Sequence, residues 1–380
     1  MLDFSNAKLN KVILHKTGNK AREEQLVLSD TELMLNDSIM EMLKGFFLGH
    51  FSNEAFYNFT PKGQPDDNEV YTAINNIFSS EEYFIPESKA IAAKLYDAGS
   101  HPKIKAGDLY IATFSDLVVD DELVDAVGIF KSETKQDFLR IDISGNKFDI
   151  KIEEGINLNK IDKACLIYNT EPDFGYKINI IDNVNKQTEA QYWRTDFLGI
   201  EQRKDDFYQT QKYMELCKDF VEEVYNEEHE VEKPQQIAML NKSKNYFKEN
   251  EKFDKQEFEE NVLSQPEVIE AFNEYKQQYA EEKNVEFEDN FGVSENAAKK
   301  QQTKMKSVIK LDKNFHIYIH GDESRINRGV DPETRMKFYR DGHWQSEQNI
   351  TFAITARADA EKMRRRGDAL GVDMSIHLGD

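Results

Sequence analysis

Hydrophobic residues near the N-terminus occur at two spacings, one typical of strands and one typical of helices. The run 25–29 (QLVLS) predicts a strand, and Asp30 and Thr31 directly after it can supply the N-cap of a helix. That helix would turn one apolar face to the core. The residues at helical spacing on this face are Leu35, Ile39, Met42, Leu43, Phe46 and Phe47.

A polar, turn-rich loop and a second helix follow. Residues 60–68 (TPKGQPDDN) combine Pro, Gly, Asp and Asn and predict a loop. Pro86 suits the first turn of a helix and Gly99 suits its end. The spacing places Ile91 and Leu95 on the inward face of this helix.

From Asp108 onward, short apolar segments are separated by Gly, Asn, Asp or charged residues. These intervals leave no room for crossover helices, so we expect an antiparallel meander rather than a parallel sheet. The predicted strands are LYIATF, VDAVGIFK, FLRIDIS, FDIKIEE, KACLIYN and YKINIID.

The segment 203–300 is rich in Glu, Lys, Gln and aromatic residues and almost lacks glycine. Two apolar stripes predict helices, the second beginning after Pro266. Residues 222–260 contain twelve acids and six lysines, which indicates solvated helix faces. The stripes are formed by Phe207, Tyr213, Leu216, Phe220 and Val224, and by Val268, Phe272 and Tyr275.

These patterns predict an α+β protein. Residues 1–200 would form an N-terminal domain of helices and mainly antiparallel sheet. Residues 201–340 would form a mostly helical C-terminal domain with a small β element, because Val308–Leu311 and Phe315–Ile319 alternate around a short connection and predict a hairpin.

Composition first argues against nucleic acid as a partner. The 380 residues include 71 acids against 49 Lys and Arg, so the formal net charge is −22. Such a charge excludes a protein that coats nucleic acid with its whole surface, although a local basic patch remains compatible with it. No apolar run spans a membrane and no signal peptide is apparent, so we expect a soluble cytoplasmic protein.

Common catalytic motifs are absent from the sequence. It contains no G-x-S-x-G, P-loop or G-x-G-x-x-G motif, and the surroundings of Cys165 and Cys217 suggest no activation. His316 and His320 are about 13 Å apart on a strand, too far to chelate one ion. His229 lacks the second His of an H-E-x-x-H motif. We therefore expect no enzyme activity, no cofactor and no metal site.

One nuclease-like pattern needs a separate hypothesis. Asp149 and Lys151 form a D-x-K triplet, and Asp142 precedes them on a neighbouring strand. Metal-dependent nucleases use such groups to hold a divalent cation and position water. The alternation of FLRIDIS and FDIKIEE favours a simpler interpretation, in which the polar residues are the solvent face of half-buried strands.

The segment Lys299–Arg340 reverses the overall charge. It contains eleven basic residues and five acids, interleaved with aromatic and amide side chains. Lys and Arg attract phosphates by charge and counterion release, and Arg adds bidentate geometry. A surface that only balances nearby acids is the alternative.

Three stretches resemble a known family. They are SVIKLDKNFHIYIHGDESRINRGVDPETRMKFYR, the strand region DLYIATFSDLVVDDELVDAVGIFKSE with FLRIDIS, and YWRTDFLG. Together they are similar, over roughly residues 1–340, to the bacterial nucleoid-associated proteins (NdpA-like). The resemblance implies association with the nucleoid, binding of double-stranded DNA and contact with DNA-handling machinery. It supplies no catalytic residues.

The resemblance ends near Arg340. Residues 341–380 form an atypical tail, because the basic residues change in kind: the first 320 residues contain four arginines and the last 60 contain eight, and Lys362 is the only lysine after Arg340. A native basic extension, a frameshifted or cloning-derived end, and a short fused module are the three explanations, so Arg364–Arg366 stay outside the predicted site.

Our leading hypothesis is a non-catalytic, cytoplasmic and nucleoid-associated protein that binds double-stranded DNA through phosphates with weak sequence specificity. It is expected to be a homodimer with no membrane contact, and its extended helical region would suit the dimer contact. The alternative is an acidic interaction protein or DNA mimic for DNA-processing machinery, with DNA topoisomerase or other nucleoid proteins as partners. The predicted DNA-binding residues are Lys299, Lys300, Lys304, Lys306, Arg325, Arg328, Arg335 and Lys337.

Overall fold

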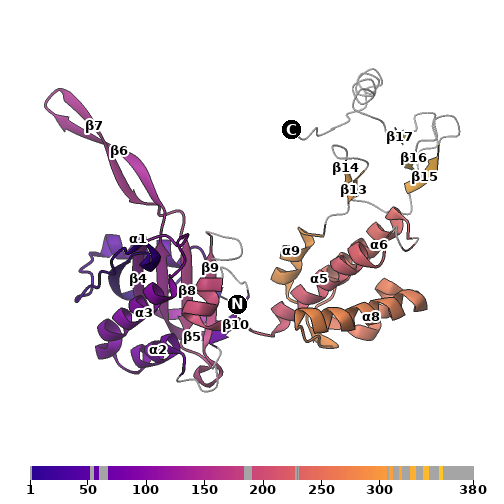
Figure 1. Cartoon of the computed structure of the whole chain (residues 1–380), viewed down its shortest axis with the longest axis horizontal. Helices are drawn as coiled ribbons and strands as arrows, with labels where there is room; N and C mark the ends of the chain where they lie inside the picture. The colour runs from indigo at the N-terminus through magenta and orange to yellow at the C-terminus, as the bar shows by residue number, and fades with distance from the viewer. Residues whose placement is uncertain are drawn as a thin grey trace. The chain divides into compact units, whose positions relative to one another are not determined.

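Residues up to Lys204 form one compact unit and residues from Asp205 onward form a second (Figure 1). The computed structural model describes residues 2–51, 55–59, 67–183, 191–226, 229 and 231–305, and beyond them only strand backbone. That strand backbone covers residues 308–310, 316–318, 326–330, 337–341 and 351–353.

Unit 1 is built on an antiparallel sheet. Among the described residues, eight strands join in the order β1-β4-β5-β8-β9-β3-β10, and β2 pairs with β4 on the same side as β1. The predicted antiparallel pairing is confirmed. The strands are β1 (Leu2–Asp3), β2 (Lys8–Thr17), β3 (Tyr57–Phe59), β4 (Gly107–Val119), β5 (Glu122–Ser132), β8 (Lys163–Tyr168), β9 (Lys177–Asp182) and β10 (Ile200–Gln202).

Helices cover both faces of this sheet, which explains its continuous apolar strands. Along β4, Leu109 and Ile111 pack on one face, and Tyr110 and Phe114 pack on the other. On the second face the ring of Phe47 stacks on that of Phe130, with 4.2 Å between centroids. The helices of unit 1 are η1 (Lys20–Arg22), α1 (Asp37–Leu48), α2 (Glu69–Ser79), η3 (Glu81–Tyr83), α3 (Phe84–Ala98), η4 (Pro172–Phe174) and the π-helix η5 (Tyr192–Leu198).

The predicted start of the first helix, and the strand predicted before it, are wrong. The segment 25–29 forms a single bridge, from Val27 to Lys16, instead of a strand. Helix α1 begins six residues later than Thr31, because the side chain of Asn36 accepts a hydrogen bond from the backbone N–H of Ile39 and caps it. Ile39 itself is exposed together with Met42, and burial is concentrated at the C-terminal end of the helix.

The second predicted helix is confirmed as α3. It ends before Gly99 and buries Ile91 and Leu95. Sequence reasoning missed α2, which begins after Asn68, and the long strand β2. Most of the predicted loop, residues 60–66, lies outside the described residues.

His15 on β2 is buried against α3. Its Nδ1 accepts a hydrogen bond from the backbone N–H of Ser29 at 3.1 Å, so its Nε2 donates to Ser88 Oγ at 3.1 Å. Burial, and to a lesser degree the charge of Lys89, lower the pKa of His15 from 6.5 to about 4. The folded unit therefore holds a neutral imidazole at neutral pH.

We expect unit 1 to lose stability as the pH falls from about 6.5 to about 4. In this range the unfolded chain protonates its imidazole and the folded chain does not, which costs on the order of 2 kcal/mol between pH 7 and pH 5. Urea unfolding at pH 7 and pH 5 measures the loss. The variant His15→Gln should lose less over the same interval, and an equal loss in both proteins would contradict this origin.

The strands β6 (Lys135–Ser144) and β7 (Lys147–Ile156) form a separate two-stranded hairpin that projects from unit 1 (Figure 1). We call it the β6–β7 arm. It is inserted between β5 and β8, which pair directly with each other. Both predicted strands are confirmed, but the predicted half-burial is wrong. Apolar side chains on the alternating face are exposed, because nothing in the described residues covers them.

Unit 2 is a helical unit around an aromatic core. The ring of Phe253 lies at its centre, 4.3 Å from that of Tyr213 and 4.7 Å from that of Phe291 between centroids. Both predicted apolar stripes are confirmed, on α5 and α8. The helices are α5 (Asp206–Glu223), α6 (Lys233–Glu249), α7 (Lys255–Phe258), the π-helix η7 (Glu259–Leu263), α8 (Pro266–Lys283) and α9 (Glu295–Gln302).

Small antiparallel sheets complete this unit, so the α+β class is confirmed. The predicted hairpin corresponds to β13 paired with β14. In the tail, the described residues are Asp341 and 351–353, and the three explanations for the tail stay hypotheses. The strands are β11 (Lys252–Asp254), β12 (Asn290–Gly292), β13 (Val308–Lys310), β14 (His316–Tyr318), β15 (Ile326–Val330), β16 (Lys337–Asp341) and β17 (Thr351–Ala353).

Candidate nucleic-acid interface

Three of the predicted DNA-binding residues lie together at the C-terminal end of α9. Ala297, Ala298 and Gln301 are buried at helical spacing, so Lys299 and Lys300 are left on the exposed side. Lys304 follows and is also exposed. These lysines also suit the negative end of the helix dipole, which is a structural reason for their presence.

The charge of Lys299 is only weakly engaged within unit 2. Lys299 pairs with Glu295 one turn earlier at 2.5 Å, with both side chains more than two-thirds exposed. Exposed pairs of this kind contribute about 0.3–0.5 kcal/mol, so a phosphate can compete for the lysine. Burial raises the pKa of Glu215, but hydrogen bonds from Lys212 and Gln211 and the charges of Lys212 and Lys304 bring it below its ordinary value.

Of the other five predicted residues, the structure describes the backbone of two. Lys306, Arg325 and Arg335 lie outside the described residues. Arg328 and Lys337 lie on the paired strands β15 and β16, where Arg328 is opposite Tyr339 and Lys337 is opposite Val330. Only the backbone is described at these two positions, so their DNA contacts stay a prediction.

Helix α6 carries further lysines that sequence reasoning missed. It contains four lysines and one glutamate, and it begins with a capping box between Glu232 and Gln235. Ile237, Leu240 and Phe247 are buried, and the solvent side bears Lys242 and Lys248. Helix α6 packs against α9. The lysines of α6 were missed because the acids on both sides of this helix dominate the count for residues 222–260.

The acids of unit 2 concentrate on other helices. Helices α5 and α8 contain five acids and two lysines each, and all five acids of α8 are exposed. Charge is therefore segregated by helix within unit 2, with α6 and α9 basic and α5 and α8 acidic. This segregation favours a surface with separate positive and negative regions over one on which the charges neutralise each other locally.

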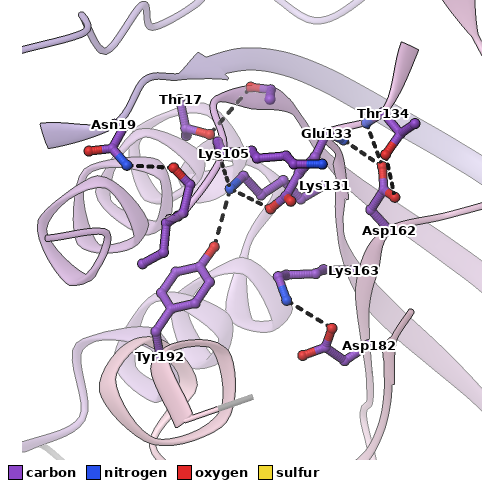
Figure 2. A network of polar contacts seen from close by, with 12 residues as sticks. Thr17, Asn19, Lys105, Lys131, Glu133, Thr134, Asp162, Lys163, Asp182 and Tyr192 are labelled. Atoms are coloured by element: carbon purple, nitrogen blue, oxygen red, sulfur yellow. Dashed lines mark hydrogen bonds and ion pairs between the residues drawn. The ribbon is translucent and has the colours of Figure 1, made fainter. Parts of the chain in front are cut away.

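A buried polar network holds the base of the β6–β7 arm (Figure 2). The carboxylate of Asp162 accepts hydrogen bonds from the backbone N–H groups of Glu133 and Thr134, both at 2.7 Å, and from Thr134 Oγ1 at 3.0 Å. These bonds join the end of β5 to the start of β8. They fix the point where the arm leaves the sheet.

Two buried lysines extend this network. The ammonium of Lys131 donates to Lys105 O at 2.7 Å, Glu133 Oε1 at 2.8 Å and Tyr192 Oη at 3.2 Å, and its side chain is 2% exposed. The ammonium of Lys163 pairs with Asp182 at 2.8 Å. Because each buried cation has an acidic partner within the network, neither ammonium group is available to a phosphate backbone.

The nuclease hypothesis gains no support from the arm. Asp142 lies opposite Asp149, but Arg140 and Lys151 both donate to it, at 2.9 and 2.7 Å. These cations occupy the oxygens that a metal ion would need. In the described parts of the chain, no three His, Cys, Asp or Glu side chains form a group that could hold a metal ion.

The cysteines and histidines singled out in the sequence give no catalytic geometry either. Burial raises the pKa of both thiols, that of Cys217 to about 12, so neither is an activated nucleophile. His229 is exposed, and its Nδ1 lies 3.2 Å from the Asn226 side chain. His320 lies outside the described residues. Every helix in the described ranges is too short or too polar to cross a membrane.

The comparisons with known proteins identify a family. The family model described as nucleoid-associated protein YejK matches residues 13–335, which include all of the described helices. A search of curated proteins finds no match to the chain.

Proposed function

Because the chain belongs to the family of nucleoid-associated protein YejK, we propose that it binds double-stranded DNA through the phosphate backbone, using the basic residues of unit 2. The family has a nucleoid-associated role. The proposed contacts are Lys299, Lys300 and Lys304 at the end of α9, Lys242 and Lys248 of α6, and the other predicted residues Lys306, Arg325, Arg328, Arg335 and Lys337. No catalytic step is part of the proposal.

The observation that carries it is the segregation of charge in unit 2. The protein has a net charge of −22, yet α6 and α9, which pack against each other, both carry exposed lysines. Helices α5 and α8 carry more acids than lysines. A lysine that contacts a phosphate does so as a point charge, and such a contact carries no sequence information. Binding should therefore be nearly independent of DNA sequence.

Titration with two unrelated duplexes of equal length tests this proposal. Both should bind at low salt with affinities within a few-fold of each other. The single strand of the same sequence serves as the comparison for duplex preference. Absence of binding at low salt would overturn the proposal, and a preference of 1000-fold for one duplex would overturn the phosphate mechanism.

A second candidate function uses the acidic helices. The five exposed acids of α8 give an acidic surface that suits a basic protein, such as a DNA topoisomerase or another nucleoid protein. Capture of such proteins that persists after nuclease treatment would support this function. Loss of every partner after nuclease treatment would show that DNA bridged them.

The homodimer expected from the sequence remains part of the proposal. The sequence places the dimer contact on the extended helical region. The structure offers a second apolar surface for this contact. The most exposed run of large apolar side chains in the described residues is on the β6–β7 arm.

A further inference from the structure

One face of the β6–β7 arm is apolar at six positions in its outer part, and the next cross-strand pair on this face, toward the base, is Asp137 with Glu154. Cross-strand neighbours are Leu139 with Ile152, Ile141 with Ile150, and Ile143 with Phe148. All six side chains point to the same side, since residues directly opposite share a face and alternate residues repeat it. Each residue is 61–72% exposed. We call this surface the arm's apolar face.

The opposite face of the arm is complete without a partner. Arg140 pairs with Asp142 and Glu153, both at 2.9 Å, and Lys151 pairs with Asp142 at 2.7 Å. These groups are exposed to water and matched in charge. The apolar face, in contrast, exposes hydrophobic side chains to water. Contiguous exposed apolar patches of several hundred Å² mark interaction sites.

The base of the arm is fixed to the sheet of unit 1 by hydrogen bonds. The bonds of Asp162 to Glu133 and Thr134 hold its two strands where they leave the sheet. Ten residue pairs continue the ladder outward from this base. An isolated two-stranded hairpin is only marginally stable in water, so an arm of this length is expected to be covered on one side.

The lack of charge at the six positions of the apolar face indicates what kind of partner can cover them. None of its six apolar positions carries a charge, so the face offers nothing to a phosphate backbone. If these six residues were fully covered, each copy would bury at most roughly 800 Å², which is about the area that each partner contributes to a standard protein interface. These six positions are also self-complementary, because two copies that meet across them place no like charges opposite each other, and Asp137 and Glu154 of each copy lie nearer to its own base.

We propose that the apolar face of the arm packs against the same face of a second copy of this chain. With a two-fold axis near Ile141 and Ile150, the tip residues of one arm would cover Leu139 and Ile152 of the other. Isoleucine and leucine side chains from two such faces interdigitate as in packed β-sheets. This contact rests on the homodimer of the proposed function, and it does not depend on DNA binding.

The test is the molar mass of the full chain, measured by light scattering and sedimentation equilibrium across a range of concentrations. The wild type should have the mass of two chains. The double variant Ile141→Glu with Ile150→Lys should weaken self-association at least 100-fold and have the mass of one chain. Its new side chains form an opposite-charge pair across the strands, which preserves the hairpin.

A matched control keeps the apolar face intact. Ser144→Glu places a similar ion pair on the polar face, opposite Lys147, and should remain dimeric. A second variant replaces residues 135–156 by a short glycine-serine linker and should be a folded monomer even where the double variant does not fold. A monomeric wild type at every concentration, or a dimeric linker variant, would overturn the proposal.

Discussion

Replacing Asp162 by alanine should lower the free energy of unfolding of unit 1 by about 3 kcal/mol. Asp162 is 1% exposed, and its carboxylate accepts from two backbone N–H groups and one hydroxyl. Without it, the N–H groups of Glu133 and Thr134 lose their acceptor in a partly buried place. An unsatisfied buried donor costs about 1–3 kcal/mol, and a charged acceptor strengthens each bond that is lost.

Hydrogen exchange of the amides in β5 and β8 measures this effect in unit 1 separately from unit 2. The variant Asp162→Asn keeps one carbonyl acceptor and should lose less stability than Asp162→Ala. Asp149→Ala removes an exposed carboxylate from the arm itself and should leave unit 1 within about 0.5 kcal/mol of the wild type. A loss below 1 kcal/mol for Asp162→Ala would contradict its role at the base of the arm.

Reversing three charges at the end of α9 should give the largest functional effect. We expect the variant Lys299→Glu, Lys300→Glu and Lys304→Glu to bind duplex DNA about 100-fold more weakly at low salt. Each substitution removes an attraction to phosphate and adds a repulsion. The loss should be the same for unrelated DNA sequences, because lysine contacts to phosphate carry no base information.

The control must change the net charge equally at another place in unit 2. Lys252→Glu, Lys255→Glu and Lys283→Glu do so on β11, α7 and α8, outside the proposed contact region. This control should lower the affinity only by the general effect of a more acidic protein. Equal losses in the two triple variants would mean that net charge, and not the position of these lysines, governs binding.

Much of unit 1 could be predicted because its strands have an unambiguous local pattern. LYIATF and KACLIYN are nearly continuous apolar runs, which strands have when both faces are covered, and they form β4 and β8. Helix α3 was also predictable, since Pro86, Gly99 and the inward residues agree. The first helix was harder because several residues between 30 and 36 can cap a helix, and only the packing of its C-terminal end selects Asn36.

The environment of the β6–β7 arm could not be predicted from its pattern. FLRIDIS and FDIKIEE alternate as any half-buried strand does, and alternation does not say whether the covering surface belongs to the same chain. The charge of α6 was missed for a different reason. Counting over residues 222–260 averaged its four lysines with the acids on either side, and only the helix boundaries separate them.

The salt dependence of duplex DNA binding tests the central claim most directly. If the ten proposed residues, Lys242 and Lys248 included, each contact a phosphate, the logarithm of the association constant should fall against the logarithm of the salt concentration with a slope of about −9. The α9 triple variant should reduce the magnitude of this slope by about 3. A slope near zero, or an unchanged slope in the triple variant, would contradict the proposed phosphate contacts of unit 2.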